Sequence, residues 1–580
     1  MQSSRPRVLS FLFALALLLM LPAFVSAAQV GNPLCPGEEV LYNPGNGQDI
    51  VVPSGYTVSV FAKDLNFPTA VAFRGNRNNF EVYVLQSGHG LPSKCNDETA
   101  WPGGVSSATN PFTPDILVFN QVGVLLRGPL AKPSSGSASL LAHGPSIDIA
   151  FEKGFQGGRL FATDSDQAIR SPGAQNNSSR IVTVDPETGV VTPFITGLPT
   201  GDHPAEQITF KGNWIYWSQG STTNSGVVGN DNGGGANQPD IPCQDIVLST
   251  NTFSSGGGVF TSGYSLHGVT NPGGVVPAFT GATGPGICDG AILRAKINSD
   301  NPKSTIEPFS WGYRNPYGIR FAPEHHALKG GLFVTENGED ERGARPTNNS
   351  PDRLQLARQN PNGSPDYHGW PDRFGFLEST QAVFNPVGGP GDDDPAAVVG
   401  KPVKPVLAFP PQPITAPLAL EPSDVAAVGL DFVPDSFVTG PVRKGAALVS
   451  REGDFGFSKA NGSPEAGHDV ELVNFSKEGD PLQLQLSLFA HNTTFEQAFP
   501  DGLRGINRPV DLKFGPDDCA YLVDYGAVRD FGQSDPASTF CPAQRPDGTP
   551  NPSFPACLTD GTGPLVQIPG TGVIWKICKQ

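Results

Sequence analysis

The sequence predicts an all-β fold, and three observations support this prediction. Glycine (70) and proline (58) together exceed a fifth of the 580 residues, which indicates many turns and loops. Short apolar or alternating runs recur along the chain, as in the strand expected at Tyr56–Ala62. Long amphipathic helical patterns are absent after the N-terminus. Hydrophobic residues (38%), with 36 phenylalanines among them, are numerous enough for a sizeable core.

One unit of three strands recurs six times: an apolar strand, a turn, a strand ending in a polar residue or glycine, a loop and a closing strand. The predicted units are Thr69–Phe73, Glu81–Leu85 and Ile116–Phe119; Ser146–Phe151, Arg159–Thr163 and Arg180–Val184; Glu206–Phe210, Trp214–Ser218 and Ala291–Ile297; Gly318–Phe321, Gly331–Thr335 and Arg353–Ala357; Val425–Phe432, Ala446–Ser450 and Val470–Asn474; and Val510–Phe514, Ala520–Asp524 and Gly572–Ile577.

No single unit can bury both faces of its sheet, so the units must pack around an axis. The sequence therefore predicts a six-bladed β-propeller. Seven blades are the alternative, because the first unit is the least regular. The strand at Tyr56–Ala62 is expected to complete the last blade and to close the ring.

Residues 29–580 are predicted to form a single propeller domain, because no linker separates the units. Long insertions interrupt it at about 224–286, 385–400 and 530–569. Loops of this length usually carry function or remain mobile.

The first 28 residues have the pattern of a secretory signal peptide. Arg5 and Arg7 precede a short apolar run from Ser10 to Val25, and Ser26-Ala27-Ala28 provides small residues for cleavage. A retained membrane anchor is the alternative, but the run is shorter than the ~20 residues that a span needs. We therefore expect a secreted or periplasmic protein without stable membrane insertion after cleavage.

Eight cysteines and a net charge of −17 limit the function classes further. An even number of cysteines in an exported chain indicates disulfides. No CxxC pair is present, which argues against a zinc site. The connectivity stays open, and pairing of neighbours (Cys35–Cys95, Cys243–Cys288) is one possibility. The acidic charge, with no basic stripe, disfavours nucleic acid as a partner.

Four loops lie at equivalent places in successive units, and in a propeller such loops meet at one end of the central channel. They carry one histidine, three arginines and an asparagine: His203, Arg314, Asn315, Arg451 and Arg508. An imidazole suits a general base, and several guanidinium groups suit a ligand with several carboxylates.

Structural roles are the alternative for two of these residues. His203 could only cap its own turn. Arg451 could form a salt bridge with Glu452 or Asp454, which follow it closely. The equivalent positions of His203 and Arg314 in successive units favour a shared site.

Several segments resemble the glucose/sorbosone dehydrogenase family, which includes the soluble quinoprotein sugar dehydrogenases. These segments are GDHP before an apolar strand, WGYRNPYGIRFAP, GGLFVTENGEDERGARP, DYHGWP and NRPVDLKFGPDDCAYLVDYG. The likeness covers about residues 50–580 apart from the insertions. It implies a six-bladed propeller that binds pyrroloquinoline quinone (PQQ) and calcium. It also implies oxidation of an aldose, or of a related alcohol or aldehyde, by hydride transfer to the quinone.

The resemblance also implies roles for single residues. His203 matches the family's general base, and Arg314 and Asn315 match its quinone-contacting pair. Arg508 matches an arginine near the quinone carboxylates, and Arg451 is a looser match. The resemblance therefore implies that the cofactor is bound by Arg314, Asn315, Arg451 and Arg508. The metal ligands and the electron acceptor stay unknown.

The chain departs from the family pattern at several positions. Tyr317 stands where the best-known sugar dehydrogenases have glutamine, and Ser221 where they have a carboxylate. Arg353 stands where a calcium-binding carboxylate is expected, and Lys444 is a candidate for the quinone-contacting lysine. The segment Tyr367–Pro371 has one residue more than the usual pattern.

Two other functions remain open. A propeller can be a non-catalytic extracellular binding module, because a fold does not determine function. A metal-dependent lactonase would need several carboxylate or asparagine ligands around the channel. The loops offer arginine and histidine rather than an acidic ring, so the lactonase ranks last.

Overall fold

The computed structural model describes the six predicted units and much of the first insertion. The described residues are 30–31, 39–40, 42–88, 110–132, 139–141, 144–166, 178–229, 238–254, 258–278, 280–281, 284–285, 287–340, 343–347, 349–384, 402–411, 415–454, 466–476, 483–498, 503–530 and 565–580. The predicted signal segment 1–28, the insertion at 385–400 and most of 530–569 lie outside them, so what the sequence predicts there stays a prediction.

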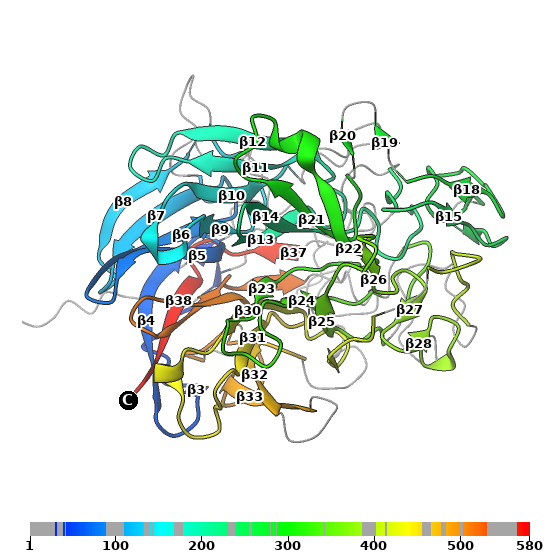
Figure 1. Ribbon diagram of the computed structural model, residues 1–580. Coiled ribbons are helices and arrows are strands. Elements are labelled where there is room, and N and C mark those ends of the chain that lie inside the picture. Colours follow the sequence, from blue (N-terminus) through cyan, green and yellow to red (C-terminus); the bar gives the residue numbers. More distant parts are fainter. Residues whose placement is uncertain are drawn as a thin grey trace, which may run out of the picture.

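Six sheets are arranged around a common axis, which confirms the six-bladed propeller (Figure 1); they are antiparallel except where the short β26 (Asp366–Tyr367) pairs parallel with β22 (Glu307–Trp311) of blade 3. Blade 1 contains β5 (Pro68–Asn76), β6 (Asn79–Gln86), β7 (Asp115–Asn120) and β8 (Leu125–Leu130); blade 2 contains β9 (Ile149–Phe151), β10 (Leu160–Asp164), β11 (Ser179–Val184) and β12 (Val191–Leu198). Blade 3 contains β13 (Ala205–Lys211), β14 (Trp214–Gln219), β21 (Ala291–Lys296) and β22 (Glu307–Trp311); blade 4 contains β23 (Ile319–Phe321), β24 (Leu332–Glu336), β25 (Arg353–Ala357) and β29 (Ala419–Leu420). Blade 5 contains β30 (Ala427–Phe432), β31 (Ala447–Arg451), β32 (Asp469–Ser476), β33 (Gln483–Asn492) and β3 (Ile50–Val51); blade 6 contains β34 (Pro509–Phe514), β35 (Ala520–Asp524), β38 (Gly572–Lys579) and β4 (Tyr56–Leu65).

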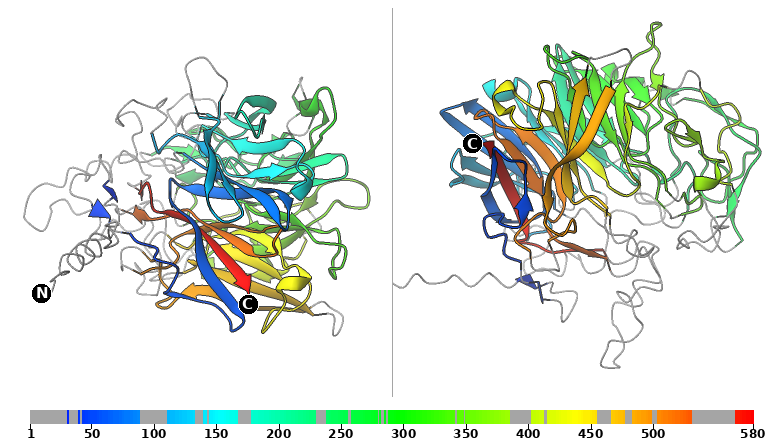
Figure 2. Two further views of the ribbon diagram at one scale, coloured as in Figure 1. Left: turned by 90° about the vertical axis from the view of Figure 1, so that its left-hand side faces the viewer. Right: turned by 90° about the horizontal axis from the view of Figure 1, so that it is seen from below.

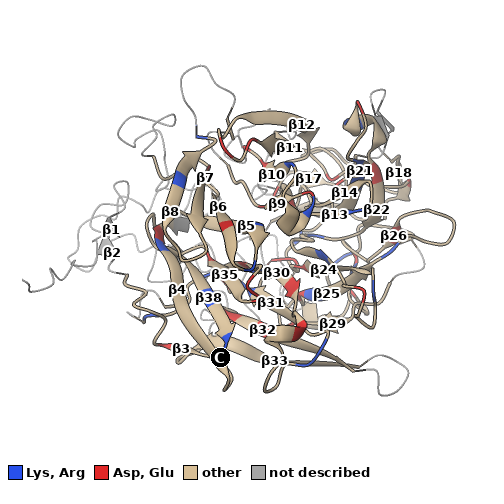
Figure 3. Ribbon diagram, turned by 60° about the vertical axis from the view of Figure 1, so that its left-hand side comes forward, with Lys and Arg blue, Asp and Glu red and all other residues tan. Residues whose placement is uncertain are grey.

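Helix is nearly absent from the described part of the chain. It is limited there to short 3₁₀ turns: η3 (Gly154–Gln156), η4 (Pro302–Thr305), η5 (Ala382–Phe384) and η6 (Asp435–Phe437). None of these turns is long and apolar enough to cross a membrane. Basic and acidic side chains are interspersed over the strands rather than gathered into a basic stripe (Figure 3).

The ring closes through the pairing of the two ends of the propeller. The N-terminal strand β4 is the outermost strand of blade 6 and pairs antiparallel with the C-terminal strand β38, with Val60 opposite Trp575. Figure 2 shows the two strands side by side. A disulfide between Cys519 and Cys578 joins the start of β35 to β38. The predicted closure by Tyr56–Ala62 is therefore confirmed.

Apolar clusters fill the spaces between neighbouring blades, one at each of the six interfaces. For example, Tyr83 of blade 1 and Leu160 of blade 2 share one cluster, and Leu512 of blade 6 packs with Leu448 of blade 5 in another. Each blade thus buries its two faces against its neighbours, as the repeat argument requires.

The innermost strand of every blade is an edge strand, so its free backbone groups face the axis. Side chains from other blades satisfy several of them. Asp148 of blade 2 accepts a hydrogen bond from Ile208 N at 2.9 Å, and Asp431 of blade 5 accepts one from Phe514 N at 3.0 Å. Lys513 of blade 6 donates to Asp148 at 2.5 Å. Polar contacts across the axis therefore supplement the apolar interfaces.

The first insertion forms small hairpins beside blades 3 and 4. They include β15 (Ile246–Val247) with β18 (Val275–Val276), and the segment between β25 and β29 of blade 4 adds β27 (Arg373–Phe374) with β28 (Leu377–Glu378) (Figure 1). The disulfide Cys243–Cys288 closes this insertion. This pair is one of the two neighbour pairings that the sequence suggested. Cys35, Cys95, Cys541 and Cys557 lie outside the described residues.

Candidate functional site

The candidate site lies at the end of the channel where the innermost strands begin, which we term the upper mouth. His203 lies two residues before β13, Arg314 lies in the segment between β22 and β23, and Arg508 directly precedes β34. The structure thus places three of the predicted loops at the same end of the propeller, as the equivalent positions of the units require.

Backbone hydrogen bonds fix the loop that carries His203. His203 N donates to Ser221 O at 3.1 Å, and Asp202 N donates to Thr222 O at 3.0 Å. Gly220 lies directly behind the imidazole, because a Cβ atom there would be 2.1 Å from His203 Cβ. The absence of a side chain at Gly220 therefore allows the observed position of His203.

The segment with Arg314 and Asn315 is joined to the same loop. Ser221 N donates to Arg314 O at 2.8 Å, and Arg314 N donates to Glu336 Oε1 at 2.9 Å. Asn337 N donates to Asn315 O at 3.0 Å. Hydrogen bonds thus join the loops of blades 3 and 4 at the upper mouth.

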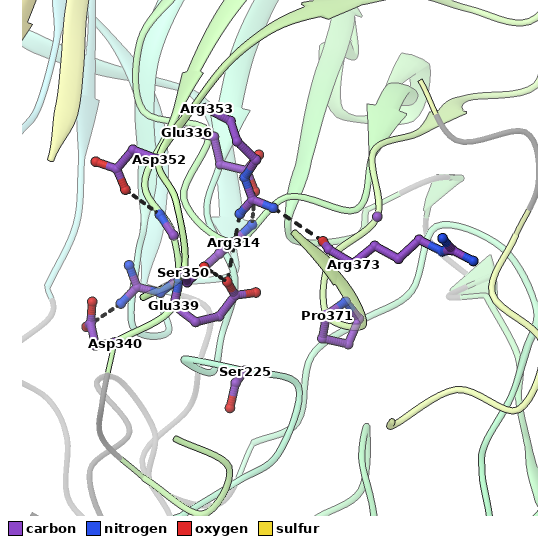
Figure 4. Close-up of polar contacts among 12 residues, drawn as sticks. Ser225, Arg314, Glu336, Glu339, Asp340, Ser350, Asp352, Arg353, Pro371 and Arg373 are labelled. Carbon is purple, nitrogen blue, oxygen red and sulfur yellow. Dashed lines mark hydrogen bonds and ion pairs between the residues drawn. The ribbon is translucent and has the colours of Figure 1, made fainter. Parts of the chain in front are cut away.

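One carboxylate links the two principal side chains of the site. Asp202 Oδ2 lies 3.5 Å from His203 Nδ1 and 3.6 Å from Arg314 Nη2. Arg314 Nη2 also forms an ion pair of 2.5 Å with Asp340 (Figure 4). The Asp202 carboxylate can therefore stabilise a protonated imidazole while Arg314 balances its charge.

A buried acid, Glu206, lies beneath these groups on β13. Burial raises the pKa of Glu206 well above its usual range; Arg314 opposes the shift, and the carboxyl groups of Asp202 and Glu452 add to it. The side-chain amide of Asn315 lies 2.6 and 2.8 Å from the two carboxyl oxygens of Glu206. The site therefore contains an acid whose environment favours its neutral form.

Arg508 forms the wall of the mouth on blade 6. Its side chain is buried and donates to Gly453 O at 3.0 Å and to Asp454 O at 2.9 Å. Burial raises the pKa of the nearby Glu452, and the positive charge of Arg508 opposes this shift. Arg508 is thus within electrostatic reach of the acids at the mouth.

Arg451 occupies a different environment from the other predicted residues. Its guanidinium forms a bidentate pair with Asp469, with both N–O distances at 2.7 Å. It also lies 3.3 Å from Glu421 and 3.4 Å from Glu471. These carboxyl groups differ from the expected partners Glu452 and Asp454. The prediction that Arg451 contacts a cofactor stays a prediction.

Tyr317 closes the channel below the upper mouth. Its ring packs against Ile147 of the segment before β9 and against Val428 of β30, so it spans the axis. Burial raises the pKa of its hydroxyl well above the usual range, and the charges of Glu206 and Glu452 add to the shift. Tyr317 is thus a buried side chain that divides the channel.

The position at which a calcium ligand was expected is occupied by the positively charged side chain of Arg353. The Arg353 guanidinium lies 3.0 Å from Glu336 and 3.8 Å from Glu339, and all three side chains are fully buried (Figure 4). Within the described ranges, no group of three or more His, Cys, Asp or Glu residues could hold a metal ion. The residues at this position therefore do not fit calcium.

The sequence analysis missed the acids of the upper mouth. Asp202, Glu206, Asp340 and Glu452 surround Arg314 and Arg508, so the mouth is more acidic than its loops indicated. Within the described residues, however, these acids form no group that could hold a metal ion. Glu206 had no clear signal in the sequence, because β13 also contains Gln207, Thr209 and Lys211, so an acid does not stand out there.

Comparisons with known proteins give structural neighbours only. No protein-family model matches the chain, and no curated protein matches it. The PQQ-bound form of an aldose sugar dehydrogenase from Streptomyces coelicolor is 14% identical, with a TM-score of 0.41 over 91% of this chain and 99% of that one.

Two further solved structures have similar values. The calcium structure of a Trichoderma reesei carbohydrate-active enzyme of family AA12 is 13% identical, with a TM-score of 0.44 over 93% of this chain and 99% of that one. A glucose dehydrogenase is 13% identical, with a TM-score of 0.41 over 81% of this chain and 96% of that one. At these identities and scores, the likeness does not determine the family or the activity of this chain.

Proposed function

We propose that the protein is an oxidoreductase that oxidises an aldose, or a related alcohol or aldehyde, at the upper mouth with PQQ as hydride acceptor. The observation that carries the proposal is the joint position of His203 and Arg314, which share the Asp202 carboxylate at the start of the channel. A base beside a cationic ligand group is the arrangement that such a reaction needs.

The upper mouth can accept part of a quinone carboxylate. The Arg314 side chain is 4% exposed, and its Nε is buried without a hydrogen-bond partner among the described residues. Because Nε is sealed from solvent, a carboxylate or carbonyl oxygen of the ligand would accept its hydrogen bond from the terminal nitrogens of the guanidinium. Burial favours the neutral forms of Glu206 and Glu452, which reduces repulsion of an anionic ligand. When bound, PQQ would supply a carbon centre that accepts hydride.

His203 would remove the proton of the substrate hydroxyl. Its side chain is 18% exposed at the mouth, so a substrate can approach it from solvent. The resulting imidazolium would be stabilised by Asp202, and Arg314 would hold Asp202 in place from its other side. The proton would then leave His203 to solvent.

Calcium has no assigned role in this proposal, because the expected position contains Arg353. The metal-dependent lactonase also gains no support from the described residues, since the acids of the mouth do not form a metal-binding group there. A non-catalytic binding propeller would retain Arg314 but would not need His203.

A titration of the purified protein with PQQ tests the cofactor assignment. Arg314→Ala should weaken binding about tenfold to a hundredfold, the range for losing a hydrogen bond to a charged group. Arg314→Lys should restore the affinity only in part, because lysine lacks the planar fork. Arg373→Ala is a matched control, since Arg373 pairs with the half-exposed Glu378 in the hairpin of β27 and β28.

The same titration decides the role of Arg451. An Arg451→Lys variant keeps a cation beside Asp469, and it should weaken PQQ binding only if Arg451 contacts the cofactor. Equal affinities for wild type and Arg314→Ala would contradict the proposal.

A further inference from the structure

A second pocket lies at the opposite end of the channel, which we term the lower mouth. It has a volume of about 270 Å³ and is formed by residues of all six innermost strands. Along β13, Phe210 of the pocket lies four positions after Glu206 of the upper mouth. At ~3.3 Å per residue, the two places are about 13 Å apart. The Tyr317 side chain also separates them, so this pocket is not part of the site described above.

The walls of the pocket are mainly aromatic and aliphatic. Its aromatic lining consists of Phe73, Phe151, Phe155, Phe210 and Phe514. Several of these rings are held from behind by other rings: Phe73 packs on Tyr521 at 4.9 Å and Phe514 on Phe437 at 5.0 Å between centroids. The walls are therefore rigid, and the space suits a ligand with one ring.

The cations of the pocket already have carboxylate neighbours. Lys513 lies 2.5 Å from Asp148, and Arg320 lies 3.5 Å from Asp431. Asp511 lies a further 3.3 Å from Lys513. Because the local charges balance or are slightly negative, an anionic ligand would be repelled. The ligand should be uncharged.

One hydrogen-bond donor of the pocket is left over. The Arg320 side chain lines the pocket and is 19% exposed; neither of its terminal nitrogens makes a hydrogen bond to another described residue, whereas its Nε donates to Leu430 O at 3.3 Å. The two Asp431 oxygens already accept hydrogen bonds from Phe432 N and Phe514 N. The pocket therefore offers a donor, and its ligand must supply an acceptor.

We propose that the lower mouth is a binding site for a small uncharged ring compound with a carbonyl group. The ring contacts the phenylalanine walls, and the carbonyl oxygen accepts a hydrogen bond from the exposed part of the Arg320 guanidinium. This site is independent of the proposed oxidoreductase function, because its residues take no part in the upper mouth.

Acetophenone is a suitable probe, with ethylbenzene and benzoate as comparison ligands of similar size. Their affinities for the full-length protein can be measured by ligand-observed NMR titration. We expect acetophenone to bind about tenfold more tightly than ethylbenzene, which lacks the acceptor, because the donor is charged. Benzoate should bind more weakly than acetophenone.

Two variants test the location. Phe155 is 45% exposed at the rim, so Phe155→Ala should keep the fold and weaken acetophenone binding severalfold. Phe376→Ala is the matched control, since Phe376 is 66% exposed in the turn between β27 and β28 and should leave binding unchanged. Arg320→Met should abolish the preference for acetophenone over ethylbenzene.

The proposal is overturned if wild type binds none of the probes, since the pocket would then be only the water-filled end of the channel. It is also overturned if Phe155→Ala binds acetophenone as tightly as wild type, or if benzoate binds best. The Phe155 and ligand comparisons decide the matter even if Arg320→Met does not fold.

Discussion

Replacing Lys513 with methionine will remove a cation that bridges carboxylates across the propeller axis. Lys513 Nζ lies 2.5 Å from Asp148 Oδ1 and 3.3 Å from Asp511 Oδ2, and it also donates to Ile149 O at 3.3 Å. The three charged side chains are only 8%, 1% and 0% exposed. The variant would therefore leave two carboxyl groups in the interior without their counter-charge.

Removing one partner of a buried ion pair typically costs 3–5 kcal/mol, so we expect a destabilisation of about that size. The lower end of the range is the more realistic value here, because both carboxyl groups retain hydrogen bonds. Ile208 N still donates to Asp148, and Gln207 Nε2 still donates to Asp511. Methionine keeps the apolar length of the side chain, so little packing is lost.

The assay is urea-induced unfolding followed by tryptophan fluorescence, with the midpoint and the slope compared between variants. Lys444→Met is the matched control, since Lys444 pairs with Asp435 at 2.6 Å, but the two side chains are 71% and 52% exposed. An exposed pair should contribute less than about 1 kcal/mol. Adding Asp148→Asn to Lys513→Met should restore part of the loss. Equal effects of the two lysine substitutions would refute this reasoning.

Three further predictions concern the His203 loop, the buried acids behind it and the ring closure. Gly220→Ala should reduce turnover while keeping the fold, because the new Cβ would displace His203; a folded variant with full turnover would contradict this. Burial raises the pKa of Asp240 to about 7, and the charge of Asp240 helps to raise the pKa of its buried neighbour Asp289. The stability that their protonated forms contribute is therefore complete below about pH 4 and is lost as the pH rises through 7. Melting temperatures from pH 5 to 8 should therefore fall less for Asp240→Asn than for wild type, and parallel curves would disprove the interaction. Cys519→Ala with Cys578→Ala should lower the free energy of unfolding by about 2–4 kcal/mol, measured by urea unfolding, because the disulfide closes a loop of 59 residues; an unchanged midpoint would show that strand pairing alone closes the ring.

The inner three strands of each blade could be predicted from the sequence because they are buried on both faces. The strand β10, for example, is buried at every position and begins with the apolar run Leu160–Ala162. The outermost strands gave no such signal. In β8, no residue is buried and Leu125 and Leu126 are exposed, so the strand is defined by its pairing with β7 rather than by its own composition.

The candidate site was predictable only in part. Repeat positions placed His203, Arg314 and Arg508 at one end of the channel, because equivalent loops of a propeller meet there. The partners of Arg451 were not predictable from its neighbours in the chain. Arg451 lies directly opposite Asp469 across β31 and β32, and only the strand register reveals that pair. The role of Asp202 likewise depends on the contact between blades 3 and 4.

The most direct test of the proposed function is a single-turnover experiment. PQQ-loaded protein is mixed with an aldose, and reduction of the cofactor is followed by its absorbance for wild type, His203→Ala and the control His491→Ala. His491 lies on the outer strand β33, stacked on Phe495, so its removal should leave the rate unchanged. We predict that His203→Ala binds PQQ normally but reduces it about 10²–10⁴-fold more slowly, the usual contribution of a general base. Reduction by His203→Ala at the wild-type rate, or no reduction by the wild type with any aldose, alcohol or aldehyde, would contradict the proposal.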